Sequence, residues 1–332
     1  MKSSILKLIS FSILISFFCT TLYPAAQAQE IIRVSYPAPD AGYAALWAAK
    51  DLGLFEKNGV KVELVYIAST PIGMAALMSG EIDVITGGAG GIISANLAGA
   101  ADLVLFAGMT RTLPFSLYSK PSIAGISQLK GTKVGITRFG STFDFAARWV
   151  LAQSGIDARR DVTLIQVGNV PGILASLKAE SIDAGILSFP SSWLAKKAGL
   201  RELADLAAMG VKYQKEAFGA RKSFLEKKKD PIKRFITALV AAIDFVKTHP
   251  EETMKIMAKY TKTDDREALQ SAYDLLVRKY LPNAPTVSAE HLALIMSDIG
   301  EKNPKTSNVS PSRFIFDQYT REVLGSRATS AQ

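Results

Sequence analysis

The stretch Pro71-Ile-Gly-Met-Ala-Ala-Leu-Met-Ser-Gly-Glu-Ile-Asp83 decides the fold, because a second version of it follows 100 residues later as Pro171-Gly-Ile-Leu-Ala-Ser-Leu-Lys-Ala-Glu-Ser-Ile-Asp183. Identical residues at this offset are Pro71/Pro171, Ala75/Ala175, Leu77/Leu177, Ile82/Ile182 and Asp83/Asp183. Three more pairs keep the same offset in apolar runs: Val34/Val134, Val62/Val162 and Leu64/Leu164. A repeat that follows the expected elements indicates two similarly built lobes.

Around both copies, short apolar runs alternate with helical patterns, as in a parallel α/β sheet. The expected strands are Ile31–Tyr36, Val62–Ile67, Val84–Thr86, Leu103–Ala107, Lys133–Ile136, Val162–Val167 and Ala184–Leu187. The expected helices are Tyr43–Leu52, Pro71–Ser79, Ser141–Ser154 and Pro171–Ala179. The pattern predicts an α/β protein with two lobes, each a mostly parallel sheet flanked by helices.

The chain is expected to leave the first lobe and return to it. We place the first lobe at residues 29–110, the second at 111–215, and the return with C-terminal helices at 216–332. Hinges are expected near Gly108–Tyr118 and Val211–Arg221, since the pattern is wholly helical after residue 222. Ligands of open α/β sheets bind outside the carboxyl ends of the strands, so two facing lobes enclose a small molecule by hinge closure.

Residues 1–28 have the pattern of a secretory signal peptide: Lys2 and Lys7, an apolar run over Leu8–Phe18, and the small residues Ala26 and Ala28 before a cleavage site. The run is too short to span a bilayer. A lipoprotein anchored at Cys19 is the alternative, although bulky Phe18 precedes that cysteine. Cleavage after Ala28 predicts a periplasmic protein without cysteine, and lowers the formal charge from +9 to +7.

Composition limits the function classes. A chain of 332 residues fits about two domains, and 48% hydrophobic residues are enough for large cores. Two histidines and one cysteine leave little room for a zinc site or a thiol enzyme, and we expect no cofactor. The basic cluster within Arg221–Arg234 is either a solvated surface or a contact for an anionic membrane or permease. This cluster lacks a nucleic-acid motif, so we expect no nucleic-acid partner. We expect the protein to be a monomer.

Three motifs carry a resemblance to a known family. They are Ala49-Lys-Asp-Leu-Gly-Leu-Phe-Glu-Lys-Asn-Gly-Val-Lys-Val-Glu-Leu-Val65, Ala75-Ala-Leu-Met-Ser-Gly-Glu-Ile-Asp83 and Leu129-Lys-Gly-Thr-Lys-Val-Gly135. The chain resembles periplasmic solute-binding proteins of ABC importers, in the NMT1-like branch for sulfonates, taurine, nitrate and thiamine precursors. The resemblance implies a type 2 periplasmic-binding-protein fold and delivery of a solute to a membrane permease.

The second lobe offers the sharpest candidate site, in Thr137-Arg-Phe-Gly-Ser-Thr-Phe-Asp144. Gly140 permits a tight turn from strand to helix, with Ser141 and Thr142 at the helix start. Backbone N–H groups there bind anions, and Arg138 would add a charge-assisted bond. The alternative is that Ser141 only caps its helix.

The first lobe has an equivalent turn, Pro37-Ala-Pro-Asp-Ala-Gly-Tyr43. Asp40 either meets a ligand amine or caps a helix, Gly42 lies in the turn, and Tyr43 is placed to stack on a planar ligand. At the next strand ends, Ser69, Thr70 and Asn169 precede the paired prolines Pro71 and Pro171, which suit a first helical turn.

The glycine-rich stretch Thr86-Gly-Gly-Ala-Gly-Gly91 does not fit a dinucleotide loop, because no acid ends the following strand. We expect the backbone at Gly87 and Gly88 to approach the ligand, with Ser188 and Phe189 as the counterpart in the second lobe and Thr110 as a weaker candidate. Asp83 and Asp183 begin their strands, away from the cleft, and are expected to be structural.

Three functions are compared. The first is an importer subunit that encloses a small anionic or zwitterionic molecule, which needs no catalytic group. The second is a thiamine-pyrimidine synthase, which the absence of cysteine after residue 28 disfavours. The third is a periplasmic ligand sensor, which would use the same cleft with a different partner.

Overall fold

A computed structural model describes residues 31–99, 102–306 and 308–330. The expected signal peptide and Cys19 lie outside these described residues. Every strand and helix expected from the sequence is present within them, with ends that agree to within a few residues. Within the described ranges, no helix is both long and apolar enough to cross a bilayer.

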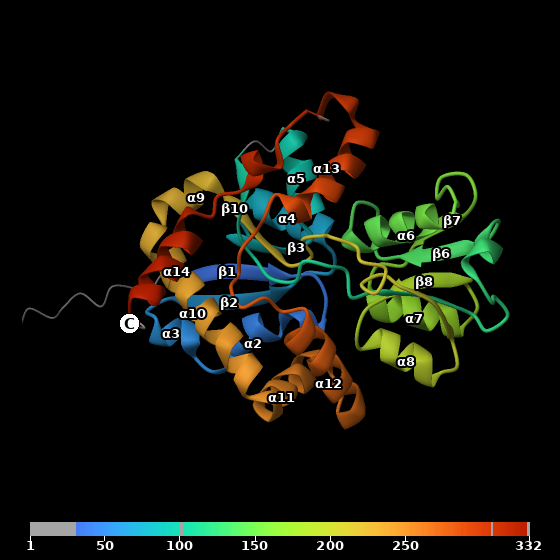
Figure 1. The fold of residues 1–332 in the computed structure, drawn as a ribbon, viewed down its shortest axis with the longest axis horizontal. Coiled ribbons are helices and arrows are strands. Elements are labelled where there is room, and N and C mark those ends of the chain that lie inside the picture. Colours follow the sequence, from blue (N-terminus) through green and yellow to red (C-terminus); the bar gives the residue numbers. More distant parts are fainter. Residues whose placement is uncertain (1–30, 100–101, 307, 331–332) are drawn as a thin grey trace, which may run out of the picture. The chain divides into compact units, whose positions relative to one another are not determined.

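The first lobe is built on a five-stranded sheet in the order β2-β1-β3-β10-β4 (Figure 1). Its strands are β1 (Ile31–Tyr36), β2 (Lys61–Tyr66), β3 (Val84–Gly87), β4 (Leu103–Gly108) and β10 (Ala217–Arg221). β1 pairs in parallel with β2 and β3, whereas β10 runs antiparallel between β3 and β4.

The second lobe repeats this architecture in the order β7-β6-β8-β5-β9. Its strands are β5 (Ser116–Ser119), β6 (Lys133–Ile136), β7 (Thr163–Gln166), β8 (Ala184–Leu187) and β9 (Arg201–Asp205). β6 pairs in parallel with β7 and β8, and β5 runs antiparallel to β8 and β9. Both lobes therefore have one βαβαβ unit completed by two further strands, and in the first lobe one of these, β10, comes from a distant part of the chain.

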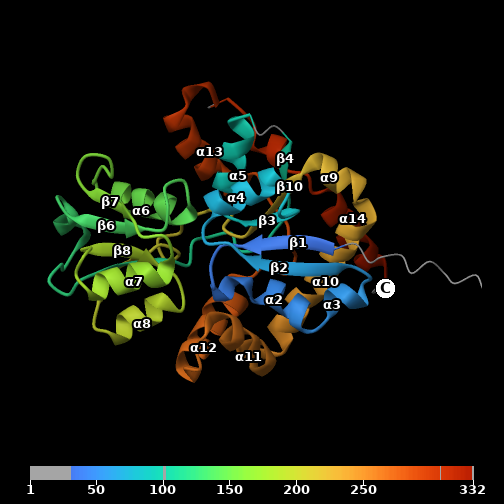
Figure 2. The same ribbon diagram turned by 180° about the vertical axis from the view of Figure 1, so that it is seen from behind.

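Helices cover both faces of each sheet (Figures 1 and 2). Those within the βαβαβ units are α2 (Ala44–Asp51), α3 (Leu54–Lys57), α4 (Thr70–Ser79), α6 (Thr142–Gln153) and α7 (Val170–Lys178). The helices that directly follow the two units are α5 (Ala89–Leu97) and α8 (Ser191–Lys197). The C-terminal helices are α9 (Lys222–Lys227), α10 (Lys229–Thr248), α11 (Pro250–Thr261), α12 (Arg266–Ala272), α13 (Glu290–Lys302) and α14 (Gln318–Ser330). Short 3-10 turns span Ala41–Tyr43, Ile126–Leu129, Pro304–Thr306 and Pro311–Phe314, and a π-helical turn spans Tyr273–Lys279.

The C-terminal helices pack against the helices of the first lobe. α10 packs on α2, α3 and α14, and α11 packs on α2. On the other face of the sheet, α13 packs on α5. Burial of the apolar face of α10, which includes Phe235, Leu239 and Ile243, stabilises this arrangement because each such side chain contributes about 1.5–3 kcal/mol when removed from water.

The repeat extends to the register of the strands. Val34 is the partner of Leu64 and Val84 in the first lobe, and Val134 is the partner of Leu164 and Ala184 in the second. Three neighbouring strands of each lobe thus keep the 100-residue offset in three dimensions.

Asp83 and Asp183 have matching structural roles in the two copies. The Asp83 carboxylate accepts the backbone N–H of Arg33 at 2.9 Å, and the Asp183 carboxylate accepts that of Lys133 at the same distance. Each also forms an ion pair, Asp83 with Arg33 at 3.1 Å and Asp183 with Lys120 at 2.6 Å. Both lie at the amino-terminal ends of β3 and β8, so they fasten neighbouring strands.

Substitution of either aspartate by asparagine is expected to reduce stability without changing ligand affinity. Loss of a charge-assisted bond to a backbone N–H costs about 1 kcal/mol in a part-exposed position. Urea denaturation of Asp83→Asn and Asp183→Asn would measure the loss, and calorimetry with a bound ligand would measure the affinity. An affinity change larger than about threefold would contradict a purely structural role.

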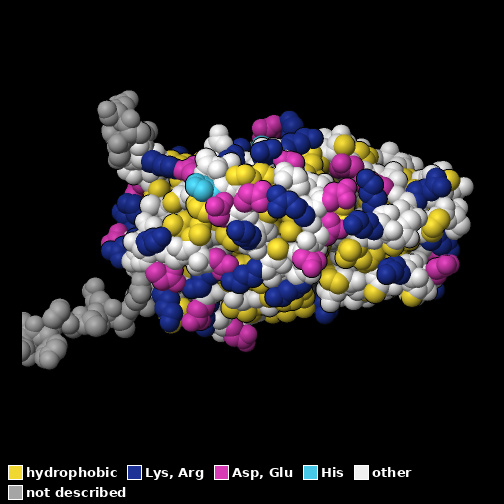
Figure 3. Space-filling model, turned by 90° about the horizontal axis from the view of Figure 1, so that it is seen from below, with side chains coloured by type: hydrophobic (Ala, Val, Ile, Leu, Met, Phe, Trp, Pro, Cys, Tyr) yellow, Lys and Arg dark blue, Asp and Glu magenta, His cyan; other side chains and the backbone are white. Residues whose placement is uncertain are grey.

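The basic cluster over Arg221–Arg234 is partly neutralised by acidic neighbours. Lys222 lies 3.7 Å from Glu226, and Lys233 lies 2.8 Å from Glu322. On the face of the molecule shown in Figure 3, lysine and arginine side chains are interspersed with acidic ones.

Candidate ligand-binding cleft

A small cavity of about 30 Å³ lies where the carboxyl ends of the strands of both lobes meet. The first lobe contributes two loops and the edge-strand residue Tyr66, and the second contributes the loops that follow β6 and β7. The lining residues are Pro37, Ala38, Pro39, Tyr66, Ser69, Thr70, Thr137, Ser141, Thr142, Phe143, Gly168, Asn169 and Val170.

Three helices begin at this cavity: α4, α6 and α7. Their first residues, Thr70, Thr142 and Val170, all belong to the lining. Each helix start carries unpaired backbone N–H groups and the positive end of the helix dipole. Convergence of three such ends makes the cavity attractive to a negative group.

The three helix starts are capped differently. The Ser141 hydroxyl accepts the N–H of Asp144 at 3.2 Å, and the Asn169 side-chain oxygen accepts the N–H of Gly172 at 2.8 Å. Both residues are therefore helix caps, as one of the two interpretations of Ser141 expected. No side chain caps α4, and the hydroxyl of its N-cap residue Ser69 is buried without a hydrogen-bond partner among the described residues.

Ser69 also has an unusual backbone conformation, with φ of 75°. A non-glycine residue in this region is strained and is found most often at functional sites. A buried, unpartnered hydroxyl costs about 1–3 kcal/mol unless a ligand satisfies it. Among the lining residues, Ser69 is thus the one whose buried hydroxyl lacks a hydrogen-bond partner within the described part of the chain.

The two lobes touch beside the cavity. A β-carbon built on Gly88 would lie 2.2 Å from the Thr142 hydroxyl and 2.9 Å from the Tyr213 hydroxyl. The Tyr213 ring packs on Phe145 with ring centres 4.6 Å apart. A cavity of this size holds one or two water molecules, so entry of a larger solute requires the lobes to separate.

A buried charged cluster of Asp40, Lys215 and Glu216 lies behind the Pro37–Pro39 wall of the cavity. All three side chains are at most 5% exposed. The Lys215 ammonium lies 3.2 Å from an Asp40 oxygen and is hydrogen-bonded to Glu216. The second Glu216 oxygen accepts the N–H of Thr110 at 3.1 Å. The cluster therefore joins the cleft loop to both segments that connect the lobes.

Aromatic rings and a glycine complete the surroundings of Lys215. Its ammonium lies 5.6 Å from the ring centre of Tyr43 and 5.3 Å from that of Phe115, within cation–π range. Gly42 leaves space for the cluster, since a β-carbon there would lie 2.5 Å from a Glu216 oxygen.

The cluster shifts the pKa values of Glu216 and Lys215. Burial raises the pKa of Glu216, and the negative charge of Asp40 adds to this, against the opposing effect of Lys215. For Lys215, burial alone would lower the pKa, but Asp40 and Glu216 outweigh it and the pKa is raised. The Lys215 ammonium is therefore charged at neutral pH, and it lies between Asp40 and Glu216.

The structure brings five of the predicted site residues to the cavity wall: Ser69, Thr70, Ser141, Thr142 and Asn169. A further three, Asp40, Gly42 and Tyr43, lie in or against the charged cluster. Asp40 caps the turn Ala41–Tyr43 by accepting the Gly42 N–H at 2.8 Å, and its other oxygen is paired with Lys215, so neither oxygen is open to a ligand amine.

The other predicted site residues lie around the cavity without lining it. Gly87 has φ of 154°, and a β-carbon there would lie 2.7 Å from the Thr70 hydroxyl. Arg138 and Gly140 are exposed on the loop before α6. Ser188 and Thr110 are buried, and Phe189 packs against the core of the first lobe. Contact of these residues with a ligand stays a prediction.

Lys215, Glu216 and Tyr66 are site residues that the sequence patterns did not indicate. Lys215 and Glu216 fall in a segment interpreted only as a hinge, although a charged pair directly before the apolar run Ala217–Ala220 was a usable signal. Tyr66 is the last residue of the edge strand β2, and so lies at a strand end like those that carry the candidate loops. The residue is 47% exposed.

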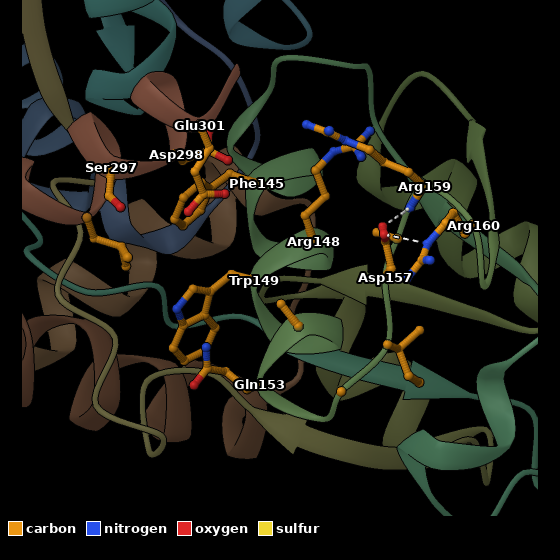
Figure 4. Close-up of a pocket in the computed structure, with 15 residues that line it drawn as sticks. Phe145, Arg148, Trp149, Gln153, Asp157, Arg159, Arg160, Ser297, Asp298 and Glu301 are labelled. Carbon is orange, nitrogen blue, oxygen red and sulfur yellow. Dashed lines mark hydrogen bonds and ion pairs between the residues drawn. The ribbon is translucent and has the colours of Figure 1, made fainter. Parts of the chain in front are cut away.

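A second, larger hollow of about 600 Å³ lies between α6 and α13 (Figure 4). Arg148, Arg159 and Arg160 stand on the second-lobe wall, and Asp298 and Glu301 stand on α13. Arg148 pairs with Asp144 and Arg160 with Asp157, both on their own wall. Fewer helices begin at this groove than at the cleft. Within the described residues, no cluster of His, Cys, Asp or Glu could hold a metal ion.

Comparison with known proteins defines the class. The crystal structure of the nitrate-binding protein NrtA from Synechocystis PCC 6803 superimposes with a TM-score of 0.76 at 15% identity, covering 90% of this chain and 89% of that one. The alkanesulfonate-binding protein SsuA from Xanthomonas axonopodis pv. citri, bound to MOPS, gives 0.71 at 19% identity, covering 87% and 99%. The desulfurization enzyme DSZB gives 0.66 at 15% identity, covering 90% and 100%. The fold is that of two-lobed periplasmic binding proteins, as the resemblance implied.

The family follows from sequence. The model of the NMT1/THI5-like family matches residues 40–253, which is more than half of the chain. A protein of Brucella abortus (strain 2308) that carries the name of a binding protein is 26% identical over 263 residues, covering 75% of this chain and 77% of that protein. The chain belongs to the NMT1/THI5-like family.

Proposed function

We propose that this protein is the exported solute-binding subunit of an ABC importer, which closes its two lobes around a small anion and delivers it to a membrane permease. The observation that carries the proposal is the convergence of the α4, α6 and α7 starts on one cavity between the lobes. Binding at helix starts needs backbone N–H groups and hydroxyls but no catalytic group. The periplasmic location and the permease follow from the family resemblance and from the signal pattern in residues 1–28.

The geometry favours an anion over a zwitterion, which refines the broader expectation from the sequence. Ser69, Thr70, Thr142 and three helix starts offer donors to a negative group. A ligand ammonium would need an acceptor with charge, and the nearest cleft carboxylate, Asp40, is already occupied by Lys215 and Gly42.

A matched pair of compounds tests this preference. 1-Propanesulfonate and taurine have the same sulfonate and nearly the same size, but taurine ends in an ammonium. We expect 1-propanesulfonate to bind at least about tenfold more tightly, because an unpartnered ammonium in the closed cleft would lose its hydration. Calorimetric titration with both compounds measures the ratio; tighter binding of taurine would reverse the assignment.

The general proposal is tested by a ligand screen. Sulfonates, nitrate, pyrimidines and small aromatic acids are added singly, and the melting temperature is recorded. A ligand that binds the native state raises the melting temperature by mass action. At a ligand concentration of 100 times Kd, the free energy of unfolding increases by about 2.7 kcal/mol. One-to-one binding of an anion supports the proposal, and the absence of any melting shift across the screen would reject the ligand class.

A further inference from the structure

Asp265 fastens the second lobe to the C-terminal helices through one of its two carboxylate oxygens. The first oxygen caps α12 by accepting the N–H of Ala268 at 3.1 Å. The second accepts the indole N–H of Trp193 at 3.1 Å and the ammonium of Lys197. One oxygen of this carboxylate therefore caps α12, and the other links α12 to α8, so the two roles can be separated by mutation.

Trp193 and Lys197 belong to α8 of the second lobe, whereas α12 belongs to the segment that packs on the first lobe. The two helices lie side by side in both ribbon views (Figures 1 and 2). The Lys197 ammonium also lies 5.5 Å from the ring centre of Trp193, so the three side chains form one unit. We name this unit, Trp193, Lys197 and Asp265, the interlobe clasp. Its members do not line the cavity.

The ion pairs on the other face of the second lobe are of a different kind. There α6 faces α13 across the groove of Figure 4, and the ion pairs of Arg148 and Arg160 stay within the second lobe. The charged contact to α13 on this side comes from Lys212 in the connecting segment, which pairs with Glu290 at 2.7 Å. Among the charged contacts of the described residues, the clasp is thus the one that joins α8 to the C-terminal helices, on the side away from α6 and α13.

The charge state of the clasp is set by its own contacts. The ammonium of Lys197, then the N–H groups of Ala268 and Trp193, hold the pKa of Asp265 at about 2. The carboxylate is therefore ionised at neutral pH, with both oxygens available as acceptors. Lys197 is 52% exposed, so solvent weakens the ion pair and the contact is breakable.

We propose that the interlobe clasp holds the lobes together in the closed state and so sets the rate at which a bound ligand is released. This inference rests on the proposed function, since release has meaning only for a ligand-binding cleft. A contact made only in the closed state raises ligand affinity by its differential stabilisation of that state, although it never touches the ligand. Trp193, Lys197 and Asp265 are thus positioning residues for closure.

Asp265→Asn is the sharpest variant. The remaining side-chain oxygen still caps α12, since asparagine is a good N-cap. The amide nitrogen would face the donors of Trp193 and Lys197, so the clasp is broken while the helix is kept. Lys197→Met removes the ion pair from the other helix and leaves the hydrogen bond of Trp193 to Asp265. Glu251→Gln is the matched control, because Glu251 pairs with Arg266 at 2.8 Å between α11 and α12 without joining the lobes.

Two measurements read the effect. Cys19 is the sole cysteine of the sequence, so in a Cys19→Ser chain the pair Glu63→Cys and Thr163→Cys, on edge strands β2 and β7, carries two spin labels that report the interlobe distance. Stopped-flow dissociation of 1-propanesulfonate reports release. We expect both clasp variants to shift the distance toward longer values and to release the compound about two- to fivefold faster, while Glu251→Gln matches the parent.

The outcomes separate the two proposals. If Asp265→Asn and Lys197→Met match Glu251→Gln in distance and release, the clasp has no role in closure. If the distance shifts but neither 1-propanesulfonate nor any compound of the screen binds, the clasp stands as a closure device and the ligand class is wrong. A distance that shifts in only one of the two clasp variants overturns the assignment of the three side chains as one unit.

Discussion

Replacement of Lys215 by methionine is expected to reduce the free energy of unfolding by about 3–5 kcal/mol, the cost of removing one partner from a buried ion pair. Methionine fills most of the volume but leaves the carboxylates of Asp40 and Glu216 facing each other at a site where all three side chains are nearly fully buried. The ring of Phe115 offers these carboxylates no donor to replace the ammonium.

Urea denaturation at neutral pH measures this loss. Lys212→Met is the control, because Lys212 pairs with Glu290 at the surface three residues away, and its loss should be small. In the double variant Lys215→Met with Glu216→Gln, one of the two negative charges is removed, so part of the stability should return. A loss below about 1 kcal/mol in Lys215→Met would mean that the cluster is compensated in some other way.

The pH dependence of Glu216→Gln follows from the same cluster. The folded protein holds the pKa of Glu216 above the ordinary value of 4.5. A group with a raised folded pKa contributes stability that is present below 4.5 and is lost as pH rises through the folded pKa. Glutamine cannot titrate, so the stability of Glu216→Gln relative to the parent should increase as pH rises from about 4.5 to 7. An unchanged difference over that range would contradict the raised pKa.

The parts of the fold that were predictable are those with local sequence signals. The βαβαβ units have strands with apolar runs, helices with apolar periodicity, and a proline in the first turn of α4 and α7. Because the same signals occur twice at one offset, the two-lobed architecture could be predicted from the amino-acid sequence. The helix cap Ser141 was one of the two interpretations of that residue, since caps are set by residues only three positions apart. Asn169 was expected only to contact the ligand, and its role as the cap of α7 was not predicted.

The parts that were missed depend on contacts between distant residues. β5 and β10 have four and five residues, and each pairs with strands from a remote part of the chain. They lie inside the two segments expected to be plain hinges, so that expectation was incomplete: each connection ends as a strand of the sheet it enters. The contact of Asp40 with Lys215 and the contact of Asp265 with α8 join residues 68 or more positions apart, which no local pattern reveals.

Replacement of Gly88 by alanine is expected to prevent full closure of the lobes and to weaken ligand binding by about 10- to 100-fold. The backbone of Gly88, with φ of −63° and ψ of 131°, accepts alanine without strain. The new β-carbon, however, would lie 2.2 Å from the Thr142 hydroxyl of the other lobe and 2.9 Å from the Tyr213 hydroxyl. Overpacking of this kind costs about 1–3 kcal/mol, and here the lobes avoid it by staying apart.

The signature of this variant is a loss of affinity with little loss of stability, because the clash exists only between closed lobes. Calorimetry with 1-propanesulfonate gives the affinity, and urea denaturation gives the stability. Gly125→Ala is the control, since a β-carbon there meets no atom within 4 Å. Thr142→Ala removes the nearest clashing atom, so Gly88→Ala should cost less in that background than in the parent. Affinity equal to the parent in Gly88→Ala would show that the contact of Gly88 with Thr142 is not part of the ligand-bound state, and the glycine would then serve only the packing of α5 against its own lobe.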